Sequence, residues 1–256
     1  MSGTDARGPV VGGVLAVLLL SGVACGPGAG PTQGSSSGAT VPRTAEGKPD
    51  LSGIWQVLGT AAWNIQDHSA EKGVPAGQGV VEGNVIPYVP SALETRNEHF
   101  KNRLTADPET KCFQPGMPRI MYMPYPFQIV QTPGYIGLLF EYNHTIRHLR
   151  FDGEHPEGPI EWALGDSRAS WDRDTLAVDT VHFGSETWFD RAGNFHSDAM
   201  HLVERFALLD RDHLNYEVTV EDPKVFSRPW KMTMPFYRRI EKNLQILEYV
   251  CQSFIS

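Results

Sequence analysis

The sequence lacks the features that mark nucleic-acid-binding proteins and proteins with membrane-spanning helices. Its 22 Lys and Arg residues are outnumbered by 30 Asp and Glu residues, so the net charge is -8. A nucleic-acid backbone is bound by clustered basic side chains, and this acidic balance therefore argues against a nucleic-acid partner. The apolar run at residues 10–20 is only 11 residues long, whereas a spanning helix needs roughly 18 or more. We expect neither a nucleic-acid partner nor a membrane-spanning helix.

Motifs for common cofactors and metals are also missing. The sequence contains no haem-attachment, dinucleotide, HExxH or EF-hand motif. The loop at residues 188–198 is rich in possible metal ligands, which His201 could complete; its polar residues are Asp190, Asn194, His196 and Asp198. Their spacing matches no metal template, and residues 190–194 are more typical of a turn at a polar barrel rim. The sequence therefore predicts no cofactor and no metal.

Cysteine is scarce, and the first of its three positions indicates an exported protein. The apolar run follows Arg7 and precedes small residues that end at Ala24, which is the pattern of a signal peptide over residues 1–24. Cys25 then resembles the acylated cysteine of a lipoprotein, and the Gly/Pro/Ser-rich residues 25–48 are expected to be a flexible, disordered tether. We expect a lipoprotein that faces the periplasm or exterior and touches the membrane only through Cys25. Cleavage by ordinary signal peptidase would instead give a soluble periplasmic or secreted protein.

The two remaining cysteines, Cys112 and Cys251, are predicted to form a disulfide. Acylation of Cys25 leaves an even number of thiols in the body of the chain, and an odd thiol is a liability in an oxidising compartment. The bridge would join the segment after the predicted helix to the last predicted strand.

Residues 49–256 are predicted to form a single, mainly β domain. The capping-box spacing of Ser91 and Glu94 predicts one short α-helix near residues 91–104. After Cys112 the apolar residues alternate with period two between turn signals, which predicts about nine to eleven antiparallel strands in all. The clearest of these cover residues 127–132, 135–151, 168–171, 175–183, 201–209, 213–221, 229–239 and 245–251. Because a closed barrel leaves no exposed strand edge, we expect an antiparallel up-and-down, lipocalin-like β-barrel.

Alternation within the strands predicts which side chains face the barrel interior. Four stripes are expected there: Leu138, Phe140, Tyr142, His144, Ile146 and His148; Met200, Leu202, Glu204, Phe206 and Leu208; Leu214, Tyr216, Val218 and Val220; Trp230, Met232, Met234 and Phe236. The interior would thus be lined by aromatic and Met side chains, as ligand pockets often are. The candidate ligand-binding residues are Phe140, Tyr142, Trp188, Met200, Trp230 and Met232.

A candidate catalytic cluster follows from the same alternation. His144 and Glu204 fall on otherwise apolar stripes, where an unpaired carboxylate would be desolvated. Paired, they could act as a general acid and base, with His196 or Asp198 at the mouth of the cavity. The alternatives are a buried structural His–Glu pair, or bonding of Glu204 to Arg147 or Arg205.

Several motifs together resemble a large family of exported bacterial proteins without an assigned reaction, many of them lipoproteins. The main motifs are Pro-Asp-Leu-Ser-Gly-Ile-Trp at residues 49–55, Met-Pro-Tyr-Pro-Phe-Gln-Ile-Val-Gln-Thr-Pro-Gly at 123–134, Tyr-Asn-His-Thr at 142–145 and Glu-Tyr-Val-Cys at 248–251. The resemblance implies export and names no chemistry. The similarity of the strand plan to lipocalin-like barrels concerns architecture alone.

Two hypotheses about function follow. In the first, an anchored barrel binds a small apolar or aromatic molecule in its interior. In the second, the same cavity belongs to a cofactor-free lyase, isomerase or hydrolase that uses His144, His196, Asp198 and Glu204. Convergence of these four side chains would favour the enzyme, and their separation would favour the binding protein.

Overall fold

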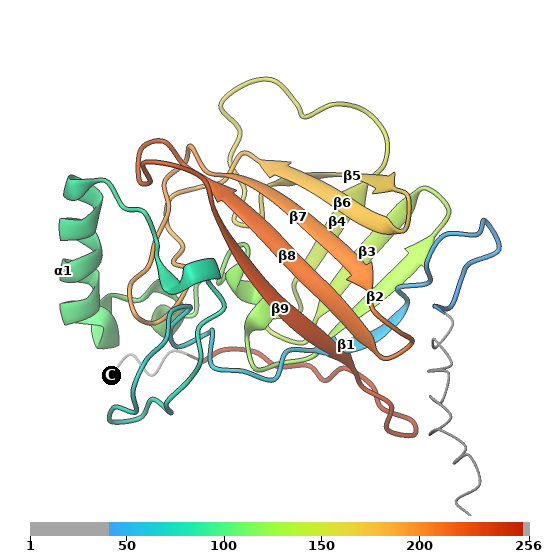
Figure 1. The fold of residues 1–256 in the computed structure, drawn as a ribbon, viewed down its shortest axis with the longest axis horizontal. Coiled ribbons are helices and arrows are strands. Elements are labelled where there is room, and N and C mark those ends of the chain that lie inside the picture. Colours follow the sequence, from blue (N-terminus) through green and yellow to red (C-terminus); the bar gives the residue numbers. More distant parts are fainter. Residues whose placement is uncertain (1–40, 253–256) are drawn as a thin grey trace, which may run out of the picture. The chain divides into compact units, whose positions relative to one another are not determined.

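The computed structural model describes residues 41–252, whose strands form a closed barrel (Figure 1). The strands of this part of the chain are β1 (Gly53–Gln56), β2 (Phe127–Thr132), β3 (Tyr135–Phe140), β4 (Ile146–Arg150), β5 (Asp166–Asp172), β6 (Thr175–Val181), β7 (His201–Leu208), β8 (His213–Glu221) and β9 (Trp230–Arg238). The helices described are α1 (Pro90–Ala106) and the short 3-10 helices η1 (Glu82–Asn84), η2 (Pro108–Lys111) and η3 (Arg119–Tyr122). The predicted mainly β barrel with one α-helix is confirmed. The predicted signal peptide, Cys25 and residues 26–40 of the predicted tether lie outside the described residues.

The order of strands in the barrel is their order in the sequence, with β1 closing against β9. Neighbours are antiparallel except for β4 and β5, which are parallel and pair only at Leu149–Ser167 and Arg150–Arg168. An odd number of strands cannot alternate in direction all the way around a ring, so a nine-stranded barrel needs one parallel pair. The connection at residues 151–165 returns the chain along the barrel and produces that pair. The up-and-down prediction holds for every other pair.

The predicted inward stripes of β7, β8 and β9 are confirmed. Burial alternates along all three strands, because successive side chains of a strand point to opposite faces of the sheet. Aromatic rings from several strands meet inside: Tyr216 stacks on Phe236 with ring centroids 4.9 Å apart, and Phe127 packs edge-on against Phe236 at 5.4 Å. The barrel interior is therefore a packed core.

The prediction of one long strand at residues 135–151 is wrong, because this segment forms two strands. β3 ends at Phe140 and β4 begins at Ile146, and the turn between them holds Asn143 and His144 at φ angles of 51° and 49°. This left-handed conformation cannot continue a strand. The turn also reverses the alternation, so that Ile146 and His148 are exposed while Arg147 faces the interior.

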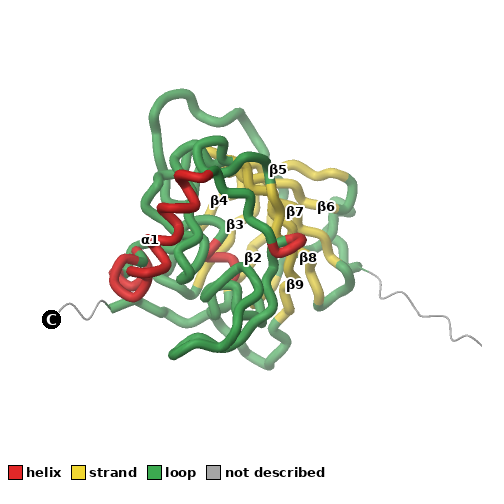
Figure 2. The backbone as a smooth tube through the Cα atoms, turned by 60° about the vertical axis from the view of Figure 1, so that its left-hand side comes forward, coloured by secondary structure: helices red, strands yellow, loops and turns green. Residues whose placement is uncertain are grey.

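Helix α1 lies outside the barrel, as Figures 1 and 2 show from two directions. It extends slightly beyond both ends of the predicted helix. Its N-cap is Val89, which makes no side-chain capping bond, so the predicted capping by Ser91 is wrong. Pro90 occupies the first turn instead, where its missing N–H costs no intrahelical hydrogen bond. No helix among residues 41–252 has both the length and the apolar character required to cross a membrane.

The disulfide between Cys112 and Cys251 is confirmed. Their Cα atoms are 5.4 Å apart, within the usual range for a bridge. The predicted strand at 245–251 is wrong, because this segment makes only an isolated bridge between Tyr142 and Tyr249. The disulfide thus fastens a strandless segment to the chain that follows η2.

The last residues of the predicted tether contact the barrel. Arg43 forms a two-pronged ion pair with Asp174, with N–O distances of 2.9 and 2.7 Å, and an isolated bridge joins Arg43 to Pro49. The indole of Trp171 lies 5.8 Å from the Lys48 ammonium. These contacts hold residues 43–49 against the hairpin of β5 and β6.

Candidate functional site

A buried ion pair between Arg147 and Glu204 occupies the barrel interior. Arg147 Nη1 donates to Glu204 Oε1 at 2.9 Å, and Nη2 donates to Oε2. Both side chains are almost completely excluded from solvent. Of the partners considered for Glu204, the structure therefore shows Arg147 bonded to it.

Hydroxyl groups complete the network around this pair. The Tyr216 hydroxyl donates to Glu204 at 2.8 Å, and Arg147 also donates to Thr180 and Ser167 at 2.9 and 3.1 Å. Burial, followed by the nearby Glu204 charge, raises the pKa of Tyr216 well above its ordinary value. A buried ion pair with these additional hydrogen bonds has the features of a structural element.

A hollow at the seam between β4 and β5 reaches this network from outside. It has a volume of about 320 Å³ and is lined by outward-facing Ile146 and His148 and inward-facing Arg147 and Ser167. It lies beside the sparse pairing of the two parallel strands. Arg147 and Ser167 are already hydrogen-bonded within the interior network. These two residues therefore have few polar groups left to bind a ligand in the hollow.

The predicted inward orientation of His144 is wrong. His144 lies on the turn between β3 and β4 and is exposed to solvent, whereas Glu204 is fully buried. The predicted alternation required an unbroken strand, but a turn interrupts the strand at this point. Arg147, three residues further on, takes the inward position beside Glu204.

The other two candidate catalytic residues lie in separate surroundings. His196 is buried, with Nε2 2.7 Å from the Thr187 hydroxyl and Nδ1 3.0 Å from the Ser197 carbonyl. Burial lowers the pKa of His196. Asp198 is exposed and forms an ion pair with Lys224 at 2.6 Å. Because His144, His196, Asp198 and Glu204 do not converge, the geometry does not support the predicted acid–base cluster.

The predicted ligand-binding residues belong to the packed core. All six are at most 7% exposed: Phe140, Tyr142, Trp188, Met200, Trp230 and Met232. Tyr142 donates to Glu109 at 2.9 Å, and Trp188 lies against His99 of α1 with ring centroids 4.3 Å apart. Other side chains fill the space in which the sequence predicted a ligand. A ligand would therefore have to bind elsewhere.

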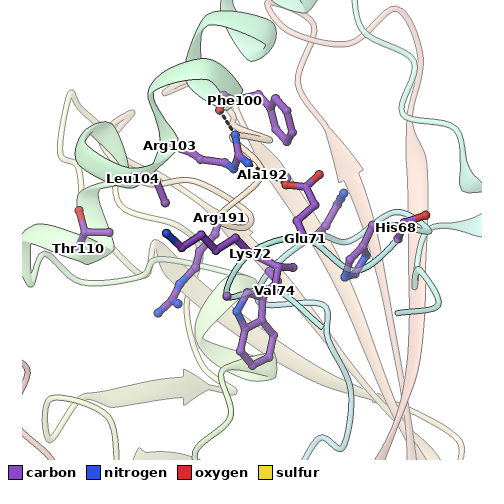
Figure 3. A pocket seen from close by; sticks show the side chains of 14 residues that line it. His68, Glu71, Lys72, Val74, Phe100, Arg103, Leu104, Thr110, Arg191 and Ala192 are labelled. Carbon is purple, nitrogen blue, oxygen red and sulfur yellow. Dashed lines mark hydrogen bonds and ion pairs between the residues drawn. The ribbon is translucent and has the colours of Figure 1, made fainter. Parts of the chain in front are cut away.

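An open pocket outside the barrel offers such a place (Figure 3). It has a volume of about 190 Å³ and lies between α1, the segment at residues 63–74 and the loop at 191–192. Its apolar lining includes Trp63, Val74, Phe100, Leu104 and Ala192. The Leu104 side chain is 82% exposed, an uncovered apolar surface beside the pocket.

Buried Asp190 holds two walls of the pocket together. Its carboxylate accepts hydrogen bonds from the Ile65 amide at 2.9 Å and from the Asn194 amide and side chain at 3.1 and 2.6 Å. The Arg191 amide donates to the Ala62 carbonyl at 3.1 Å. The predicted turn at 190–194 is therefore present. Asp190, Ala192 and Asn194 are buried in it, and Arg191 is exposed at the pocket. Burial raises the pKa of Asp190.

The wall at residues 63–74 includes one strand of a small hairpin. Backbone hydrogen bonds of 3.0 Å join His68 to Gly77 and Glu71 to Val74. Gly73 takes the tight turn at a φ of 76°, a left-handed conformation that favours glycine. The hairpin tip thereby presents Glu71 and Lys72 to the pocket.

Basic side chains surround the apolar lining. Arg103 lies over the Phe100 ring at 4.0 Å and forms an ion pair with Glu71 at 2.7 Å. Arg191 lies 6.0 Å from the Trp63 ring and pairs with Glu109 at 3.1 Å. Such cation–π contacts stabilise both partners modestly at exposed sites. The pocket therefore combines aromatic surfaces with positive charge.

Sequence reasoning missed this pocket because its residues come from three distant segments. Phe100, Arg103 and Leu104 do share one face of a helix, since residues three and four apart are neighbours there. That spacing was the available signal. Nothing in the sequence shows that Trp63 and Arg191 face the same hollow.

Comparison of the chain with protein-family models, curated proteins and solved structures finds no match. The candidate site therefore rests on its own geometry.

Proposed function

We propose that this protein binds a small apolar or aromatic molecule in the pocket between α1 and residues 63–74. The observation that carries the proposal is the grouping of Trp63, Phe100 and exposed Leu104 around one open hollow. An apolar cavity of about 150 Å³ accepts benzene, so a pocket of about 190 Å³ suits one or two aromatic rings, with further groups projecting outward. This site replaces the predicted interior site, because the core residues are already packed.

The proposal includes export and a lipid anchor at Cys25. The disulfide between Cys112 and Cys251 supports an oxidising compartment, where such bridges persist. With these two thiols paired, Cys25 is the remaining cysteine of the chain. The resemblance to exported bacterial lipoproteins supports the same address.

The test is titration with N-phenyl-1-naphthylamine, a neutral aromatic probe whose fluorescence rises in apolar surroundings. We expect saturable binding that Leu104→Ser weakens about fivefold, since loss of about 1 kcal/mol of apolar contact has that effect. Leu247→Ser is the matched control, because Leu247 is 69% exposed and does not line the pocket. Absence of saturable binding, or equal effects of both substitutions, would overturn the proposal.

A further inference from the structure

We infer that the ligand of this pocket is an amphipathic anion, an aromatic or apolar body with a carboxylate, sulfonate or phosphate head. This inference rests on the proposed function and names the class of its ligand. The head would lie between Lys72 at the hairpin tip and Arg191 on the opposite loop, both of which line the pocket (Figure 3).

Lys72 supplies a positive charge that no neighbouring group neutralises. Within residues 41–252 its ammonium forms neither a hydrogen bond nor an ion pair, and it is exposed beside Gly73. The adjacent carboxylate of Glu71 is already bonded to Arg103 at 2.7 Å. The Lys72 ammonium is therefore free to pair with an anion in the pocket.

Arg191 supplies a second positive group whose position is fixed by the backbone. Its amide is bonded to the Ala62 carbonyl, and one Nη atom donates to Glu109 at 3.1 Å. A guanidinium has five N–H donors, so others remain for a ligand. The Arg191 side chain is 45% exposed, which leaves it accessible from the pocket.

The negative groups nearby are already satisfied. Glu109 is buried and accepts hydrogen bonds from Tyr142 at 2.9 Å and Arg191, and it also lies 3.8 Å from Arg119. Glu71 is held by Arg103. An incoming anion would therefore meet Lys72 without displacing a carboxylate. A basic pocket on a chain with a net charge of -8 would also attract anions locally.

The test compares two probes that share the anilinonaphthalene body and differ in charge. N-phenyl-1-naphthylamine is neutral, and 8-anilinonaphthalene-1-sulfonate carries a sulfonate. We expect the sulfonate probe to bind more tightly than the neutral probe. Lys72→Met should weaken binding of the sulfonate probe about fivefold, since an exposed ion pair contributes up to about 1 kcal/mol. The same substitution should leave the affinity for the neutral probe unchanged. Raising NaCl from about 50 to about 500 mM should weaken binding of the sulfonate probe only, because salt screens exposed charges.

Lys242→Met is the matched control, because Lys242 is exposed, lies outside the pocket and forms no ion pair with the described residues. Arg191→Gln provides a second test, accompanied by thermal unfolding because Arg191 also contacts Glu109. Saturable binding of the neutral probe with equal or weaker binding of the sulfonate would overturn the anionic class and leave the proposed function standing. Equal effects of Lys72→Met and Lys242→Met would do the same. Failure of both probes to bind would overturn the proposed function and this inference with it.

Discussion

Arg147 and Glu204 form a fully buried ion pair that links β4 to β7 across the barrel interior, with Nη1 2.9 Å from Oε1. The strands they belong to are not neighbours in the sheet. The pair therefore connects two parts of the wall that are separated by β5 and β6. Tyr216 and Thr180 satisfy further positions of the carboxylate.

Removal of one partner of this pair should destabilise the barrel strongly. We expect Arg147→Met alone to lower the free energy of unfolding by about 3–5 kcal/mol, because it leaves an uncompensated buried charge at Glu204. Urea denaturation would measure this loss. The double variant Arg147→Met with Glu204→Leu should recover much of the stability, since apolar replacements of both partners are often neutral. A double variant less stable than either single variant would contradict this expected recovery.

The stability of the protein should decrease as the pH falls below about 6.5, partly through His196. Burial lowers the pKa of His196 from its ordinary value of 6.5, so the unfolded state binds a proton more readily than the folded state. The contribution is therefore fully present above the unfolded pKa and is lost as the pH decreases below it. Urea denaturation at about pH 7.5 and about pH 5.5 would measure the free energy of unfolding at each pH. Its decrease between the two should be smaller for His196→Gln than for the wild type. Identical decreases would exclude this contribution.

Loss of the disulfide should also destabilise the protein. The bridge between Cys112 and Cys251 encloses a sequence separation of 139 residues, for which chain entropy gives an upper value of about 4–5 kcal/mol. The double variant Cys112→Ser with Cys251→Ser should show a decrease of up to that size in urea. Mass spectrometry of unreduced peptides from the wild type should show the linked pair. Two alkylatable thiols in the unreduced protein would contradict the bridge.

Metabolic labelling with a palmitate analogue should mark the protein if Cys25 is acylated. We expect Cys25→Ser to abolish the label and to release the protein from the membrane fraction, because one residue carries the proposed anchor. A wild-type protein that remains unlabelled and soluble after export would favour cleavage by ordinary signal peptidase.

Local pattern predicted most of the barrel wall. Period-two alternation placed Glu204 and Phe206 inside, and the predicted strands at 175–183, 201–209 and 213–221 agree closely with β6, β7 and β8. The pattern failed where two consecutive residues, Asn143 and His144, adopt a left-handed conformation. Both residue types tolerate that conformation better than most, but the sequence alone does not show that they adopt it.

The sequence by itself determined the fold class, the inward stripes of β7, β8 and β9 and the pairing of the two body cysteines. Alternation and cysteine number are local or countable properties of the chain. Tertiary structure alone decided that Arg147, and not His144, meets Glu204. It alone also brought Trp63, Leu104 and Arg191 around one pocket. The reason is that such contacts depend on how segments far apart in the chain pack against one another, and one early turn changes which side chains meet.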